Sequence, residues 1–134
     1  MGQSQNLICL DVGERRIGVA VADTAVRIAV PYDTIVVDGS ELRAIAELAV
    51  RESANKFIVG YPRNQQGEAT AQSEYVERFA EQLTDIAPYL FQDESLTSVI
   101  AENRLKSRGK QYVKGDIDKE AAAIILQDYM EMNL

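Results

Sequence analysis

The spacing of apolar residues changes near Ser40, and this change restricts the folds open to the chain. Before it lie three short apolar runs, over residues 7–10, 17–21 and 26–30. Short runs separated by turn-forming residues are typical of strands, so we expect an antiparallel meander in this part of the chain. Pro31 is expected to interrupt the third strand before a further run at residues 34–37.

After Ser40 the pattern predicts alternating helices and strands. Four apolar residues share one helical face at i, i+3, i+4 and i+7, namely Leu42, Ile45, Ala46 and Ala49. Further patterns predict strands at residues 57–60 and 89–91, and helices over residues 69–86, 97–106 and 117–130. Alternation implies that the last two strands are parallel and joined by right-handed crossovers. We therefore expect an α/β fold with a mixed five-stranded sheet flanked by helices.

Histidine is absent from the chain and cysteine occurs once, as Cys9. Zinc catalysis, Ser-His-Asp triads and Cys-His dyads are therefore excluded, and an enzyme of this sequence would use carboxylates, hydroxyls, lysine and arginine around a hard metal ion. The length of 134 residues, 46% of them hydrophobic, indicates one globular domain over residues 1–134. Neither a signal peptide nor a membrane span is predicted, and the lone cysteine fits a reducing compartment, so we expect a cytoplasmic protein.

The charge of the chain is unevenly distributed. Its net charge is −7, yet residues 104–119 hold six basic and two acidic residues and so carry +4, which leaves −11 for the rest. The basic residues of this segment are Arg104, Lys106, Arg108, Lys110, Lys114 and Lys119. Such a segment is either a solvated helix end and loop or a contact for nucleic-acid phosphates, and composition does not choose between them.

Several polar residues follow the predicted strands directly. Asp11 follows the first strand, a loop over residues 60–67 with Arg63 and Asn64 follows the fourth, and Asp93 and Glu94 follow the fifth. If these strands run in the same direction, their carboxyl ends share one rim of the sheet, where α/β proteins bind ligands. Asp118 joins this set from the first turn of the predicted last helix.

Each carboxylate alone also fits a simpler role, because aspartates are common in turns and at helix starts. Together, carboxylates without histidine are the ligand set of Mg²⁺ or Mn²⁺. The pattern Asp11-x-Gly13-x₄-Gly18 fits two chemistries. It could hold a metal for phosphodiester hydrolysis, or it could bind a nucleotide phosphate as in actin-like sugar kinases.

Residues 10–23, LDVGERRIGVAVAD, resemble the opening motif of the YqgF/RuvX family, which is described as Holliday junction resolvases and as pre-16S ribosomal RNA nucleases. The resemblance continues at residues 58–62 with Asn64 and Gly67, at residues 93–97 and at residues 118–126, and so spans nearly the whole chain. It implies a ribonuclease H-like fold. It also implies that Asp11, Glu94 and Asp118 form a catalytic triad that binds Mg²⁺ or Mn²⁺, with Arg16 beside it.

One departure from the family concerns Ser95, which stands where relatives usually carry arginine after the Asp-Glu pair. Arg63 could supply a replacement charge. The residues expected to contact the substrate are Arg16, Arg63, Asn64, Arg108 and Lys110.

The resemblance favours pre-16S rRNA over branched DNA as the substrate, acted on by a monomer or homodimer. A kinase of the actin-like class would need a second domain. The remaining alternative is a protein that binds RNA, or acts in transcription, without catalysis.

Overall fold

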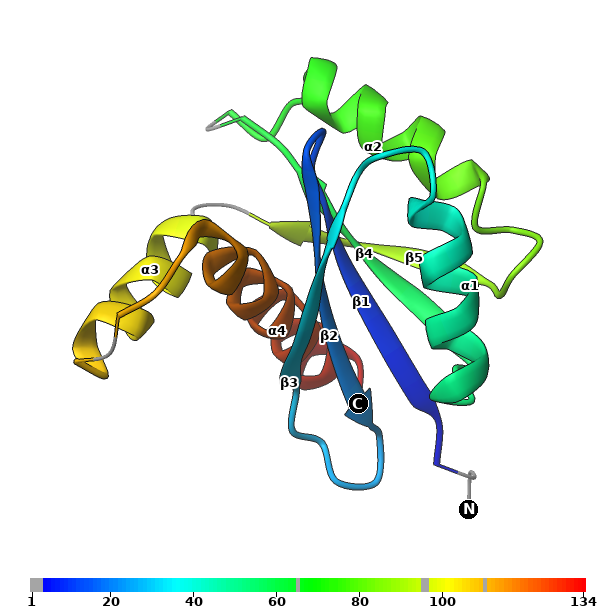
Figure 1. Ribbon diagram of the computed structural model, residues 1–134, viewed down its shortest axis with the longest axis horizontal. Helices are drawn as coiled ribbons and strands as arrows, with labels where there is room; N and C mark the ends of the chain where they lie inside the picture. The colour runs from blue at the N-terminus through cyan, green and yellow to red at the C-terminus, as the bar shows by residue number, and fades with distance from the viewer. Residues whose placement is uncertain (1–3, 65, 95–96, 110) are drawn as a thin grey trace.

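The computed structural model describes residues 4–64, 66–94, 97–109 and 111–134, and its centre is one five-stranded sheet (Figure 1). The strands are β1 (Asn6–Val12), β2 (Arg16–Asp23), β3 (Val30–Val36), β4 (Lys56–Pro62) and β5 (Tyr89–Glu94). The helices are α1 (Glu41–Arg51), α2 (Ala71–Glu81), α3 (Thr97–Ser107) and α4 (Lys114–Asn133). The strand order is β3-β2-β1-β4-β5, with β1, β4 and β5 parallel and β2 antiparallel to both of its neighbours. The expected mixed five-stranded sheet is confirmed.

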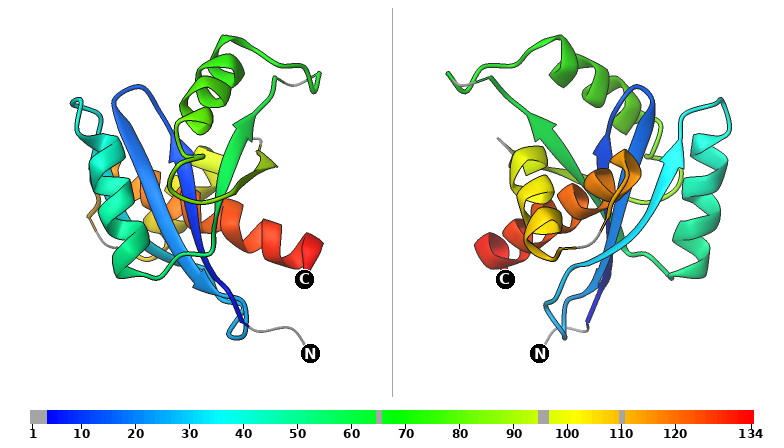
Figure 2. Two further views of the ribbon diagram at one scale, coloured as in Figure 1. Left: turned by 90° about the vertical axis from the view of Figure 1, so that its right-hand side faces the viewer. Right: turned by 60° about the vertical axis from the view of Figure 1, so that its left-hand side comes forward.

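The sheet separates two apolar cores, because side chains alternate between its faces. Along β1, Ile8 and Leu10 pack into the core beneath α1 and α2, whereas Leu7 and Cys9 pack against α4. Figures 1 and 2 show α1 and α2 on one side of the sheet and α4 on the other, with α3 packed mainly against α4. None of the helices in the described ranges is long and apolar enough to cross a membrane.

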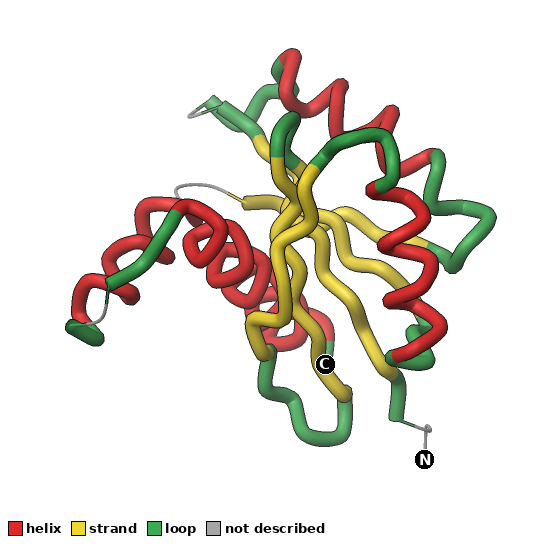
Figure 3. Tube along the Cα trace, viewed as in Figure 1, coloured by secondary structure: helices red, strands yellow, loops and turns green. Residues whose placement is uncertain are grey.

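The third strand differs from the prediction, since β3 begins at Val30 and the preceding apolar residues lie in a loop (Figure 3). The reason is a turn at Asp23, whose carbonyl accepts hydrogen bonds from the backbone of Val26 and Arg27. Arg27 has a φ of 63°, which turns the chain out of the strand direction. Pro31 lies within β3 rather than interrupting it, because β3 is an edge strand that needs no ladder bond there.

Two helices also differ from the predicted ranges. The first, α2, starts after Thr70, whose side chain caps the helix by accepting from the Ser73 amide, and it ends at Glu81 rather than near residue 86. The chain then turns, although Leu83 still packs into the core. The second, α4, begins three residues earlier than predicted, at Lys114. Asp118 therefore lies in the second turn of α4 and not in the first.

Candidate active site

The sequence predicted that Asp11 and Glu94 follow their strands, but in the structure both residues lie within the last residues of β1 and β5. Asp11 lies two residues after Cys9 on β1, so both side chains point to the same face of the sheet, the one covered by α4. Glu94 is the last residue of β5 and reaches the same face at Gly60 of β4, the strand between β5 and β1. A Cβ at Gly60 would lie 3.3 Å from Glu94 Oε1 and 2.8 Å from Ile125 Cδ1. The absence of a side chain at Gly60 therefore leaves room for the Glu94 carboxylate.

Asp118 is brought to the sheet by a second glycine. Gly18 of β2 pairs with Asp11 in the β1–β2 ladder, and a Cβ at Gly18 would overlap the main-chain carbonyl of Asp118. This close approach holds α4 directly against β2, with Asp118 beside the residue opposite Asp11. The Asp118 carboxylate accepts a hydrogen bond of 2.6 Å from Nε of Arg16, the first residue of β2.

The electrostatics show that the three carboxylates form one cluster. The pKa of Asp11 is raised well above its usual value, first by burial and then by the negative charges of Glu94 and Asp118. The thiol pKa of the buried Cys9 is also raised, by burial and by Asp11 and Glu94. The structure therefore brings together the triad that the sequence predicts.

The chemistry of these donors fits a hard divalent cation, because carboxylate oxygens are its preferred ligands and a cation would relieve their mutual repulsion. Within the part of the chain that the structure describes, no group of three or more acidic or cysteine side chains is arranged to hold a metal ion. Asp118 is instead held by Arg16, which serves as its counter-ion.

Arg63 lies on the other face of the sheet from this cluster. Its Nε donates to Asp93 Oδ1 at 2.9 Å, and its guanidinium stacks over the Tyr61 ring at 4.7 Å. Tyr61 in turn donates to Glu77 of α2. Because Asp93 and Glu94 are consecutive strand residues, their side chains point to opposite faces. Arg63 therefore does not join the carboxylates.

The remaining predicted substrate contacts are dispersed. Asn64 shapes its own loop, where its Oδ1 accepts from the amides of Gln66 and Glu68. Arg108 forms a two-pronged ion pair with Glu120 of α4. Lys110 and Ser95 lie outside the described residues, so their predictions stay predictions.

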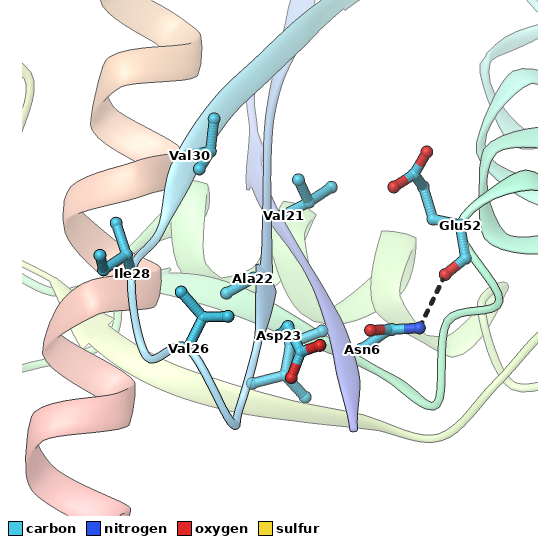
Figure 4. Close-up of a pocket in the computed structure, with 9 residues that line it drawn as sticks. Asn6, Val21, Ala22, Asp23, Val26, Ile28, Val30 and Glu52 are labelled. Carbon is cyan, nitrogen blue, oxygen red and sulfur yellow. Dashed lines mark hydrogen bonds between the residues drawn. The ribbon is translucent and has the colours of Figure 1, made fainter. Parts of the chain in front are cut away.

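Sequence analysis named Gly18 in a motif and Gly60 at the start of a loop, but it did not predict that each makes room for a carboxylate residue of the site. A signal was available for both, since a glycine inside an apolar strand often marks a close approach of another group. A separate pocket of about 320 Å³ lies at the opposite end of β1 and β2, lined by Val26, Ile28, Val30 and their neighbours (Figure 4). Its walls are mainly apolar, and it lies away from the acidic cluster.

The sheet order, together with the acidic cluster at the carboxyl ends of β1 and β5, defines a ribonuclease H-like protein. The structure of Thermus thermophilus RuvC in complex with a Holliday junction substrate has the same fold, with a TM-score of 0.60 and 14% identity over 96% of each chain. The family model described as RuvX, Holliday junction resolvase, matches residues 5–132. The chain belongs to the RuvX family.

Several curated relatives carry the name "Putative pre-16S rRNA nuclease". The protein from Chloroflexus aurantiacus is 44% identical, over 95% of this chain and 87% of its own. The relative from Caldanaerobacter subterraneus is 40% identical, over 91% of this chain and 93% of its own. The relative from Synechocystis is 39% identical, over 92% and 85% respectively.

Proposed function

We propose that this protein is a divalent-metal-dependent nuclease that hydrolyses phosphodiester bonds in the precursor of 16S rRNA. The observation that carries the proposal is the convergence of Asp11, Glu94 and Asp118 on the α4 side of the sheet, where burial and then the charges of the other two raise the pKa of Asp11. The names of the relatives support the substrate, and such a substrate places the activity in the cytoplasm.

The residues of the cluster have separate parts in this proposal. Asp11, Glu94 and Asp118 would hold Mg²⁺ or Mn²⁺, which when bound activates water and stabilises the charge on the leaving oxygen. Gly60 leaves room for Glu94, and Gly18 sets the position of Asp118. Arg16 holds Asp118 through Nε, and its two terminal nitrogens remain to donate hydrogen bonds to a substrate phosphate.

We expect the substrate to contact the α3–α4 side of the sheet more closely than the side of α2. Arg16 and Arg108 both lie on this side of the sheet, where each is paired with a carboxylate of α4. Arg63 and Asn64 belong to the loop after β4, and Arg63 faces α2. We therefore assign phosphate contacts near the reacting bond to Arg16, and leave Arg63 and Asn64 only contacts farther along the substrate.

A second function, cleavage of branched DNA, is favoured by one finding. The matching family model is described as a Holliday junction resolvase. The two functions require the same acidic cluster and differ in the shape of the nucleic acid that is bound.

Parallel cleavage assays test both functions. The substrates are a 5′ fragment of pre-16S rRNA, an unrelated single-stranded RNA and a four-way DNA junction, each with Mn²⁺ and with EDTA. We expect Mn²⁺-dependent cleavage of the pre-16S fragment, and none by Asp11→Asn. Cleavage of the junction alone would assign the second function. Binding of RNA without cleavage of any substrate would overturn the nuclease proposal.

A further inference from the structure

Glu120 is the only charged residue that is fully buried among those the structure describes, at 3% exposure. It lies on α4 two residues after Asp118, where α4 packs against α3 beside Ala101, Ala121 and Ile124. A buried carboxylate is unfavourable unless positive groups and hydrogen bonds satisfy it. The role of Glu120 therefore depends on its partners.

Two arginines provide that compensation, Arg104 in the last turn of α3 and Arg108 just after its end. Arg108 donates from Nη2 to Glu120 Oε1 at 2.9 Å and from Nη1 to Oε2 at 3.4 Å. Arg104 places Nη1 3.9 Å from the same Oε1. Both arginine side chains are about half exposed, at 52% for Arg104 and 51% for Arg108. One buried negative charge thus holds two positive charges at the surface.

We propose that Glu120 orients Arg104 and Arg108 as a subsite for the phosphodiester backbone of the substrate. A guanidinium has five N–H donors, and Arg108 uses two of them on Glu120, which leaves three for an anion. Fixing a guanidinium in advance reduces the side-chain entropy lost when a phosphate binds. The proposal rests on the nuclease function above and adds the path that the substrate takes.

The place of the pair in the fold supports this path. Asp118 and Glu120 lie two residues apart and so face different sides of α4, one toward the cluster and the other toward α3. The width of a helix, roughly 10 Å, separates two such sides. This distance is longer than the axial spacing of neighbouring phosphates on one strand of a double helix, about 3.4 Å. The pair would therefore contact phosphates a few nucleotides from the reacting bond.

A purely structural clamp explains the arrangement less well. The α3–α4 interface already has an apolar contact among Ala101, Ala121 and Ile124, and buried ion pairs are often no better for stability than apolar side chains of similar size. Arg104 also lies near Asp128, whose pKa is raised by burial and by Glu131, and its charge partly offsets that rise, so Arg104 is shared between two carboxylates. Arg108 is therefore the stronger phosphate donor of the two.

The test measures binding of a labelled pre-16S fragment by fluorescence anisotropy across a salt series, in the inactive Asp11→Asn background. Removing both arginines alone would leave Glu120 buried without a partner. The informative variant is therefore the neutral set Arg104→Gln, Arg108→Gln and Glu120→Gln, checked for folding by circular dichroism. Arg43→Gln, an exposed arginine of α1 on the other side of the sheet, is the control.

We expect the triple variant to bind about tenfold more weakly and to lose between one and two units of the log–log salt slope, because each phosphate contact contributes about 0.7–0.9. Arg43→Gln should leave both unchanged. The single variant Glu120→Gln shows whether Glu120 affects RNA binding by orienting the arginines or only by its negative charge. Simple electrostatics predicts tighter binding when a negative charge is removed, whereas loss of orientation predicts binding about threefold weaker.

A folded triple variant with unchanged affinity and salt slope would show that Glu120 is a structural clamp only. Tighter binding by Glu120→Gln would overturn the orienting role. Either failure is separable from failure of the nuclease proposal, because cleavage of the pre-16S fragment is measured on the unmodified protein. A nuclease without this subsite would still cleave in that assay.

Discussion

Gly18→Ala tests how α4 carries Asp118 to the sheet. The added Cβ would overlap the main-chain carbonyl of Asp118 and would lie 3.0 Å from the amide nitrogen of Lys119. Both neighbours are backbone atoms of a helix, so no change of rotamer relieves the overlap. The substitution must instead displace α4 from β2.

The size of the effect follows from that displacement. To restore an ordinary carbon–oxygen contact, α4 would have to move by roughly 1 Å or more. Adding a methyl group to a well-packed interior typically costs about 1–3 kcal/mol, and the rigid backbone on both sides places Gly18→Ala at about 3 kcal/mol or above. A displacement of about 1 Å in a catalytic group can lower the rate about 100-fold, so cleavage should fall by a similar factor.

Gly115→Ala is the matched control, since it adds the same methyl group to α4 itself. Its Cβ would lie 3.6 Å from the Thr34 side chain, which is an ordinary contact. Alanine is favoured over glycine in a helix by about 0.5–1 kcal/mol, so this variant should be slightly more stable. Urea unfolding of both variants measures the difference. If Gly18→Ala were as stable as Gly115→Ala, the close approach of α4 to β2 would be wrong.

Three further predictions concern the charged groups. The pKa of Asp11 is raised in the folded protein, so protonated Asp11 stabilises the metal-free fold. This stabilisation is fully present below about pH 4 and is lost as the pH rises through the raised pKa. Asp11→Asn should therefore make the free energy of unfolding fall less steeply as the pH rises. Arg16→Gln should lower the metal-free stability by about 1–2 kcal/mol and should tighten Mn²⁺ binding in calorimetry, because Arg16 and the metal compete for Asp118. The control Arg15→Gln should change neither, and equal Mn²⁺ affinity of Arg16→Gln and the unmodified protein would contradict that competition. Arg63→Ala should leave the single-turnover cleavage rate unchanged at saturating substrate, whereas a tenfold loss would place Arg63 at the reaction centre.

The sequence predicted the fold where the apolar pattern is local and regular. The face of Ile45 and Ala49 predicted α1, and the run at residues 57–60 predicted β4, because burial on one or both faces leaves a direct periodic signal. The third strand was wrong because the turn at Asp23 depends on backbone hydrogen bonds and on the positive φ of Arg27. Neither leaves a periodic pattern in the sequence.

The start of α4 was missed for a similar reason. The Asp116 side chain accepts a hydrogen bond from the backbone amide of Val113, which stabilises a first turn that lacks an apolar face. The periodic residues that predicted the helix begin only afterwards. The error moved Asp118 from the second turn to the first, although it left the residue on the correct helix.

The sequence predicted which acidic residues come together, but it did not predict the ion pairs that they form. Asp11, Glu94 and Asp118 follow from strand direction and family motif together, whereas the contact between Arg16 and Asp118 joins residues 102 positions apart. Such a pair depends on how closely α4 packs on β2. Alternation alone could have placed Asp93 and Glu94 on opposite sides of the sheet, because they are consecutive residues of β5. The pairing of Arg63 with Asp93 came only from the structure.

The arginines around the site are all held by carboxylates, so the acidic and basic groups of the site are coupled. Each is paired with a carboxylate, in the pairs Arg16–Asp118, Arg63–Asp93 and Arg108–Glu120. Each of these three pairs has no net charge, so in a chain with a net charge of −7 they offer a polyanion little net positive charge near the site. A divalent cation at the cluster would neutralise Asp11 and compete with Arg16 for Asp118, so it should strengthen the binding of nucleic acid. Linkage is reciprocal, so uncleaved RNA must raise the affinity for the cation by the same factor.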